Sequence, residues 1–444
     1  MTIPKTYHVK NFGCQMNVYD GARMGELLDA EGMMPAPEYD ADLVVLNTCH
    51  IRERAVEKVY SDIGRLRRED GSSPMIAVAG CVAQAEGAEI PRRAKEVDIV
   101  VGPQAYHHLP ALVAEVAGGR SGNRAALDLD LPGLEKFGVL PKRARQPGPT
   151  AFLTIQEGCD KFCTYCVVPY TRGAEISRPL VAIVDEARAL IDAGAVEITL
   201  LGQNVNAWSE GSTGFHDLII ALDKLPGIKR LRYMTSHPND MTEGLIQAHV
   251  DVESLMPFLH LPVQSGNDRI LKAMNRNHTT ASYLRIIERV YAARPDIAVS
   301  GDFIVGFPGE TEAEFADTLR IVEQVKYAQA YSFKYSPRPG TPAATMADQI
   351  APAVMDERLQ RLQAVINAQQ NTFNTHHVGT TTNILLERKG RLPGQLIGKT
   401  PWLQSVHISA AHAKIGDMIE VQIESAGPNS LAGKPVTAKE LHVA

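Results

Sequence analysis

The sequence predicts an α/β protein with an open parallel α/β domain, a partial (β/α)6 barrel and a small C-terminal β-barrel. Apolar runs alternate with amphipathic segments up to about residue 117, and six more do so from Ala151. Short β-type runs joined by glycine-rich turns follow residue 378, and a stretch rich in Gly, Arg and Pro predicts a linker between the first two parts. The expected boundaries are 1–117, 118–148 for the linker, 149–378 and 379–444.

Length and composition narrow the class of protein. The chain has 444 residues, of which 44% are hydrophobic, and this is enough for two or three cores. No run of eighteen apolar residues predicts a membrane span, and the first residues lack the apolar segment of an export signal. We therefore expect a cytoplasmic protein whose six cysteines are reduced thiols. The net charge of −6 argues against a globally basic nucleic-acid binder but allows local basic surfaces.

Three cysteines follow three apolar runs in the first domain. The runs are 7–10, 42–46 and 75–78, and the cysteines that follow them are Cys14, Cys49 and Cys81, the strand-end cysteines. Helical patterns separate the runs, so the strands are expected to be parallel. Ligands of an open parallel sheet gather outside the carboxyl ends of its strands, and the three thiols are expected to converge there on one site. The alternative is three buried structural cysteines, because cysteine is among the most buried residues.

The other three cysteines lie on one short loop. Cys159, Cys163 and Cys166, the loop cysteines, have C-x3-C-x2-C spacing and follow the apolar run 151–155. Three thiolates so close in sequence suit a cuboidal 4Fe-4S cluster whose fourth iron has no protein ligand. An open metal position is typical of a catalytic site. The alternatives are a zinc knuckle or a redox thiol pair, but no fourth Cys or His lies within the next twenty residues.

The six apolar runs of the second part are expected to be the strands of the barrel. Such barrels carry their chemistry at the carboxyl ends of the strands, and the loop cysteines follow the first strand. The runs are 152–155, 197–201, 230–234, 256–263, 298–305 and 330–334.

The C-terminal part resembles small barrels that bind oligonucleotides. From residue 380 onward it has seven Lys or Arg against five Asp or Glu. Phosphate contacts combined with a stacking ring are typical of single-stranded RNA recognition. The alternative is an ordinary solvated barrel surface. The candidate RNA-binding residues are Arg388, Lys389, Arg391, Lys399 and Trp402.

Several motifs together resemble the methylthiotransferase branch of the radical S-adenosylmethionine family. The sequence Cys159-Asp-Lys-Phe-Cys163-Thr-Tyr-Cys166 is similar to the signature of that superfamily, and the segment around Trp402 is similar to the RNA-binding domain called TRAM. The resemblance runs through nearly the whole chain. The other matching segments are 12–17, 46–52, 79–81, 167–178, 201–206, 260–266, 302–310 and 335–341.

This resemblance implies a reaction, its cofactors and its partners. The loop cysteines would hold a 4Fe-4S cluster that binds S-adenosylmethionine and generates a 5′-deoxyadenosyl radical. The strand-end cysteines would hold a second 4Fe-4S cluster and the sulfur to be delivered, and a second S-adenosylmethionine would supply the methyl group. The substrate would be isopentenyladenosine at position 37 of tRNA, next to the anticodon, methylthiolated at carbon 2. The implied partners are tRNA and an electron donor of flavodoxin or ferredoxin type, and we expect a monomer.

The resemblance also suggests non-cysteine site residues. Gln203 and Asn204 stand where many relatives have a Gly-Gly-Glu segment that binds the methionine amine, although the carboxylate is missing here. A second set resembles the segment near the adenosyl group, although a plain strand-end turn is the alternative: Gly301, Ile304, Gly306 and Glu310. A third set would position cofactor or substrate, although charged residues so close together are often only a surface pair: Arg172, Glu175 and Arg178.

Two other functions stay open at this point. The same chemistry could act on a ribosomal protein, in which case the C-terminal tail should not suit RNA. Alternatively, the chain could be a non-catalytic metal-binding RNA module, which would not cleave S-adenosylmethionine.

Overall fold

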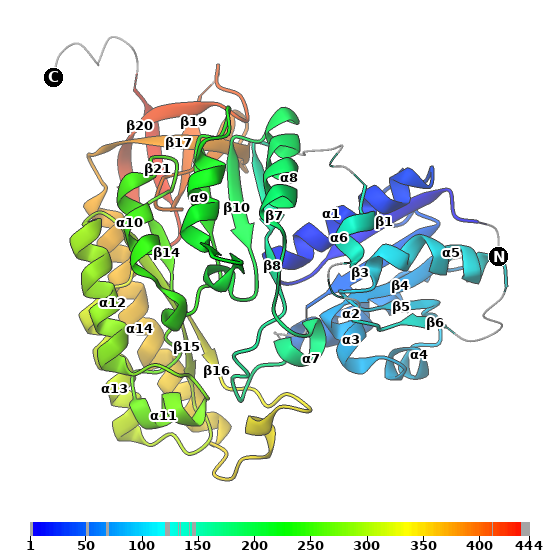
Figure 1. The fold of residues 1–444 in the computed structure, drawn as a ribbon, viewed down its shortest axis with the longest axis horizontal. Helices are drawn as coiled ribbons and strands as arrows, with labels where there is room; N and C mark the ends of the chain where they lie inside the picture. The colour runs from blue at the N-terminus through cyan, green and yellow to red at the C-terminus, as the bar shows by residue number, and fades with distance from the viewer. Residues whose placement is uncertain are drawn as a thin grey trace.

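The computed structural model consists of three parts that pack together (Figure 1). It describes residues 3–49, 53–67, 71–119, 125–131, 133, 135–141, 143, 148–410 and 412–436, with only the backbone for residues 53–56. In Figure 1 the first domain lies on the right, the barrel on the left, and the C-terminal β-barrel on top. None of the described helices is long and apolar enough to cross a membrane.

The first domain is a six-stranded parallel sheet with strand order β2-β1-β3-β4-β5-β6. Its central strands consist almost wholly of buried apolar residues because both faces of the sheet are covered. The three predicted strands are confirmed as β1, β3 and β4. The strands are Thr6–Asn11, Met34–Pro35, Leu43–Thr48, Met75–Gly80, Ile99–Val101 and Ala126–Asp128, and the helices α1 to α5 are Gln15–Ala30, Glu53–Arg65, Cys81–Glu86, Glu89–Arg93 and Leu109–Ala117.

The range 118–148 is not only a linker. Its strand β6 pairs with β5 and so extends the first sheet, and helix α6 (Glu135–Val139) packs between the first domain and the barrel. Lys136 of this helix is fully buried, donates to the carbonyl of Pro103 and pairs with Glu157. The pattern hid these elements because a three-residue strand and a five-residue helix are too short for periodicity to detect.

The second part is the predicted partial barrel, with parallel strands in the order β7-β10-β13 and β14-β15-β16. A parallel bridge from Leu231 to Leu255 connects the two halves. The helices lie on the outside, as Figure 1 shows. The strands are Thr150–Thr154, Glu197–Leu201, Arg230–Tyr233, Phe258–His260, Ala298–Val305 and Gln329–Lys334, and the helices α8 to α14 are Leu180–Asp192, Phe215–Asp223, Glu243–Asp251, Asp268–Ala273, Thr280–Ala293, Glu312–Val325 and Pro352–His376.

Alternation along the strands separates the core from the lumen of the barrel. In β10, Ile198 and Leu200 belong to the main hydrophobic core beneath the helices, whereas Glu197 and Thr199 line an internal cleft. The helices start at local signals as well. Helix α13, for example, begins with a capping box. The Thr311 hydroxyl accepts from the backbone N–H of Glu314, and the Glu314 carboxylate accepts from the backbone N–H of Thr311.

The third part is a closed five-stranded barrel with strand order β17-β18-β19-β21-β20. Two arginines of β13 attach it to the amino ends of the barrel strands. Arg230 donates to the carbonyls of Lys399 and Asn383, and Arg232 donates to those of Pro401 and Thr400. The strands are Thr381–Lys389, Gln395–Lys399, Ser405–Ser409, Met418–Ala426 and Leu431–Pro435.

Candidate metal centres

The strand-end cysteines converge at the carboxyl edge of the first sheet. Cys14 is the N-cap of α1, Cys49 directly follows β3, and Cys81 is the first residue of α3 after β4. A hydrogen bond with Cys49 lowers the pKa of the Cys14 thiol to about 6, whereas burial raises the pKa of Cys81. The Cys14 thiol also interacts electrostatically with Cys81. Three strands therefore bring together thiols that are 35 and 32 residues apart in sequence.

Gly13 allows this approach. Its φ is +104°, and a Cβ added there would lie only 2.2 Å from the Cβ of Cys49. No larger residue fits between the two cysteine-bearing turns without displacing one of them.

The loop cysteines follow a short strand, β8 (Gln156–Glu157), and precede helix α7 (Val168–Arg172). The loop is held from outside: the N–H of Thr164 donates to the carbonyl of Met274, and the Asn275 amide donates to the carbonyls of Lys161 and Phe162. Burial raises the pKa of Cys159 to about 11 and that of Cys166 to about 12. The metal-free chain therefore keeps these thiols protonated, and binding a metal must release their protons.

Each set offers three cysteine thiols, which is the ligand type that 4Fe-4S clusters take. Among the described residues, no three His, Cys, Asp or Glu side chains are placed to hold one metal ion. A structural zinc site needs four such ligands around one point. In a cuboidal cluster each thiolate binds a different iron, so the sulfur atoms stay apart. A set of three thiols without a fourth ligand fits a cluster with one open iron.

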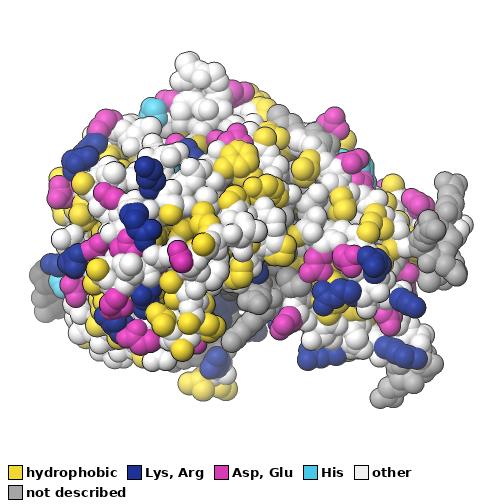
Figure 2. All heavy atoms as spheres, turned by 90° about the horizontal axis from the view of Figure 1, so that it is seen from below, with side chains coloured by type: hydrophobic (Ala, Val, Ile, Leu, Met, Phe, Trp, Pro, Cys, Tyr) yellow, Lys and Arg dark blue, Asp and Glu magenta, His cyan; other side chains and the backbone are white. Residues whose placement is uncertain are grey.

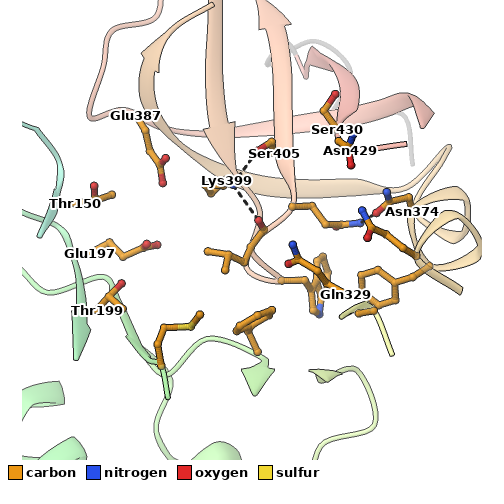
Figure 3. A pocket seen from close by; sticks show the side chains of 18 of the residues that line it. Thr150, Glu197, Thr199, Gln329, Asn374, Glu387, Lys399, Ser405, Asn429 and Ser430 are labelled. Atoms are coloured by element: carbon orange, nitrogen blue, oxygen red, sulfur yellow. Dashed lines mark hydrogen bonds between the residues drawn. The ribbon is translucent and has the colours of Figure 1, made fainter. Parts of the chain in front are cut away.

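A cleft of about 450 Å3 lies inside the barrel, between its strands and the C-terminal domain (Figure 3). Acidic and hydroxyl side chains from β7 and β10 line one end, while Lys399 and Ser405 come from the opposite domain (Figure 3). The aromatic side chains in its wall are Phe152, Phe258, Tyr331, Phe373 and Trp402. Gln15, the neighbour of Cys14, lines it too, so the cleft reaches the first domain.

Three comparisons with known proteins agree with this arrangement. Residues 6–102 match the uncharacterized protein family UPF0004, residues 153–322 the Radical SAM superfamily, and residues 376–436 the TRAM domain. The tRNA-2-methylthio-N(6)-dimethylallyladenosine synthase of Sphingopyxis alaskensis is 68% identical over 98% of both chains. Those of Erythrobacter litoralis and Novosphingobium aromaticivorans are 66% and 65% identical over 97% of both chains.

This chain belongs to the tRNA-2-methylthio-N(6)-dimethylallyladenosine synthase family. It is a radical S-adenosylmethionine methylthiotransferase with a TRAM domain, which confirms the expected fold class and enzyme class. Membership in the superfamily implies a 4Fe-4S cluster and S-adenosylmethionine.

A solved structure supports the fold alone. The radical S-adenosylmethionine methyltransferase TsrM from Kitasatospora setae superposes with a TM-score of 0.59 at 14% sequence identity, covering 78% of this chain and 77% of that one. The fold of that protein is therefore similar to this one beyond the barrel domain, although few residues are identical.

In this synthase the residues predicted to bind the methionine amine lie against the loop cysteines. The side-chain oxygen of Gln203 accepts from the N–H of Gly158 at 2.6 Å, next to Cys159. Asn204 donates to Asp240 at 2.8 Å and to Glu175 at 3.4 Å, and burial raises the pKa of Glu175. Contact of Gln203, Asn204 and Glu175 with a cofactor stays a prediction.

The segment expected near the adenosyl group also faces helix α14. A Cβ on Gly306 would lie 2.2 Å from Met355, and the Gly306 N–H donates to Glu310, which pairs with Arg358 at 2.9 Å. Gly301 is close to the Tyr327 ring, and Ile304 packs in a small cluster around Phe307. These contacts give the glycines and Glu310 a packing role, and their cofactor contacts stay predictions.

The predicted substrate residues differ in exposure. Arg388, Lys389 and Arg391 are exposed on the TRAM barrel, whereas Lys399 donates to Ser405, and the Trp402 indole donates to the carbonyl of Asp296. Arg172 and Arg178 are buried where the first domain meets the barrel, so neither lies on an open surface. On the face in Figure 2, basic and acidic side chains are interspersed.

Sequence reasoning missed two side chains that contact the cysteine loop. Arg276 donates to the Cys163 sulfur at 3.8 Å, and the Gln156 amide donates to the carbonyl of Gly158 at 2.7 Å. Gln156 directly precedes the loop, which was a usable signal. Arg276 is 113 residues from Cys163, and nothing in its local sequence indicated this contact.

Proposed function

We propose that the chain methylthiolates carbon 2 of N6-isopentenyladenosine at position 37 of tRNA, using two iron–sulfur centres. Cys159, Cys163 and Cys166 would hold the 4Fe-4S cluster that supplies radical chemistry from S-adenosylmethionine, and Cys14, Cys49 and Cys81 would hold the centre that supplies the sulfur. Family membership supports tRNA as the target over a ribosomal protein. The second centre is supported by the convergence of Cys14, Cys49 and Cys81 at one sheet edge.

Radical chemistry fits the bond that must break. No side chain has a pKa that would let it deprotonate an adenine C–H bond, so acid–base catalysis cannot activate carbon 2. The contribution of the protein is then to orient the base and to exclude water. The loop cysteines are suited to this, because Cys163 is buried and Cys159 and Cys166 are only partly exposed.

The internal cleft is the proposed site of the target base. Its volume of about 450 Å3 falls within the usual range of ligand pockets, and its aromatic walls suit a flat ring with an apolar isopentenyl group. Cys14 packs in one cluster with Phe152 and Met234, which also line the cleft. A base held there would be separated from Cys14 by these two side chains. The described lining of the cleft has one cation, Lys399, whereas the exposed TRAM cations could contact the RNA backbone outside the cleft.

Mass spectrometry of the product tests the target. The anaerobically reconstituted and reduced enzyme is incubated with S-adenosylmethionine and tRNA that carries isopentenyladenosine, and separately with ribosomal protein. A thiomethyl group is expected only on the tRNA. Transcripts without the isopentenyl group are the control, and a thiomethyl group on the protein alone would contradict the proposal.

Iron content tests the number of centres. About eight iron and eight sulfide per chain are expected after anaerobic purification, because each cuboidal cluster has four of each. Fully loaded protein with zinc, or with iron for one centre only, would contradict the two-centre proposal.

Replacing Gly13 with alanine should affect only the strand-end centre. The new Cβ would collide with that of Cys49 and separate the turns of Cys14 and Cys49. We expect G13A to lose about half of its iron but to keep cleaving S-adenosylmethionine. The control is G32A in the same domain, where φ is +83° and nothing lies within 4 Å of the added Cβ. Equal iron contents in the two variants would show that the strand-end turns tolerate the collision.

A further inference from the structure

Arg172 connects the two sets of cysteines. It ends helix α7, six residues after Cys166, yet its guanidinium reaches into the first domain. Its Nη2 lies 2.6 Å from Asp20 Oδ2 of helix α1, and its Nη1 lies 3.6 Å from Glu157 Oε1, two residues before Cys159. The side chain is buried, so the contact with Asp20 forms entirely out of solvent.

The same guanidinium acts on the strand-end cysteines. Its positive charge helps to lower the pKa of Cys14 and opposes the rise that burial causes in the pKa of Cys81. Among the main influences on these two pKa values in the described part of the chain, Arg172 is the arginine that recurs. Helix α7, which ends at Arg172, also packs directly against helix α3, whose first residue is Cys81, so Arg172 lies at the edge of the strand-end site.

Among the described residues, one donor of this side chain makes no hydrogen bond, because its carboxylate neighbour, Glu157 Oε1, is 3.6 Å from Nη1. Three buried atoms of the Asp20–Arg172–Glu157 group make no hydrogen bond within the described residues: Asp20 Oδ1, Glu157 Oε1 and Arg172 Nη1. A buried polar atom without a partner is costly, so such an atom often marks a missing ligand. Of the three, only Arg172 Nη1 can donate to an anionic sulfur.

We propose that Arg172 is a positioning residue for the strand-end centre and donates its Nη1–H to a sulfur there. The barrel domain would thereby tune a centre whose three ligands all come from the first domain. Hydrogen bonds to sulfur and nearby positive charge raise the reduction potential of an iron–sulfur cluster, because they stabilise its more negative reduced form. The proposal rests on the proposed second centre. A merely structural ion pair between Arg172 and Asp20 would leave the potential unchanged.

The test isolates the strand-end centre. In the full chain, the triple substitution C159A/C163A/C166A removes the loop ligands, so spectra and potentials report the other centre alone. In this background D20N/R172Q removes the cation together with its buried carboxylate partner, which avoids leaving an unpaired charge. The matched control is E186Q/R178Q, because Arg178 is buried in the same domain contact and pairs with Glu186 at 2.8 Å.

The expected result is a lower midpoint potential. D20N/R172Q leaves the net charge unchanged, so its effect reports the lost Nη1 hydrogen bond: reduction should weaken about tenfold, which is about 59 mV for one electron, and E186Q/R178Q should match the parent. An unchanged potential in D20N/R172Q would overturn the role of Arg172. Absence of iron from the triple-cysteine parent would instead remove the strand-end centre itself and this proposal with it.

A second measurement does not depend on the D20N/R172Q chain. The triple-cysteine chain is labelled with 15N-arginine, reduced, and studied by pulsed electron paramagnetic resonance. A 15N hyperfine coupling to the centre is expected, and it should vanish in the similarly labelled R172K chain. Its absence in the chain that keeps Arg172 would overturn the proposal, even if D20N/R172Q does not fold.

Discussion

Replacing Cys163 with alanine is expected to abolish the reductive cleavage of S-adenosylmethionine. Loss of a residue in the outer shell of a metal site commonly costs 10- to 100-fold, so loss of a direct ligand should cost more than ~100-fold. The change should not prevent folding, because the loop is held by backbone and amide contacts from Met274 and Asn275. The measurement is 5′-deoxyadenosine formed with dithionite, quantified by liquid chromatography.

The control for C163A lies in the other set of cysteines. The chain has six cysteines, three in each set, so none is left over to serve as a neutral control. The C163A chain should retain about half of its iron, bound by the strand-end cysteines. Deoxyadenosine formation at the parental rate would exclude the loop as the radical-generating site.

Replacing Cys49 with alanine is expected to separate the two halves of the reaction. Cys49 is buried between the turns of Cys14 and Cys81, far along the chain from the cysteine loop. Uncoupled cleavage of S-adenosylmethionine should continue, whereas methylthiolated tRNA should fall at least ~100-fold, because the site that holds the sulfur loses a ligand. Deoxyadenosine and modified nucleoside are measured in the same reaction.

The opposite result would be equally informative. If C49A stops cleavage while C163A only stops sulfur insertion, the roles of the two sites are exchanged. If both variants lose both activities and all iron, the two sets do not form independent centres.

The exposed TRAM cations offer a comparison, because R388A should lower tRNA affinity without altering the cleavage of S-adenosylmethionine.

The strands of the fold were predictable because their signals are local. The runs 197–201 and 298–305 became β10 and β15 with the same bounds, since both are apolar segments flanked by helical patterns. The loop cysteines were predictable for the same reason, because their spacing alone brings three thiols together. Short elements escaped detection: β6 and α6 lie in a segment that reads as irregular, and only pairing with β5 and burial of Lys136 order them.

The functions of charged residues were harder to predict. From the sequence, Arg172 and Arg178 were predicted to position cofactor or substrate. In the structure both are buried and pair with carboxylates of other elements. Trp402 stands beside basic residues as a stacking ring, yet its indole donates to the barrel at Asp296. The chemical type of a side chain limits which groups it can bind. The tertiary packing around it determines which of those groups is its partner.

The sequence by itself determined the three-part α/β architecture, the loop of three thiols and the family, because each depends on spacing within a short segment or on motifs read in order. Only the tertiary structure decided which residues lie between the two cysteine sets. Arg172 meets Asp20 across 152 residues, and Cys14 packs beside the cleft-lining Phe152. Such contacts form when two domains exclude water from the surface between them. A charge buried there is costly unless it is paired, so it pairs with an opposite charge from the other domain.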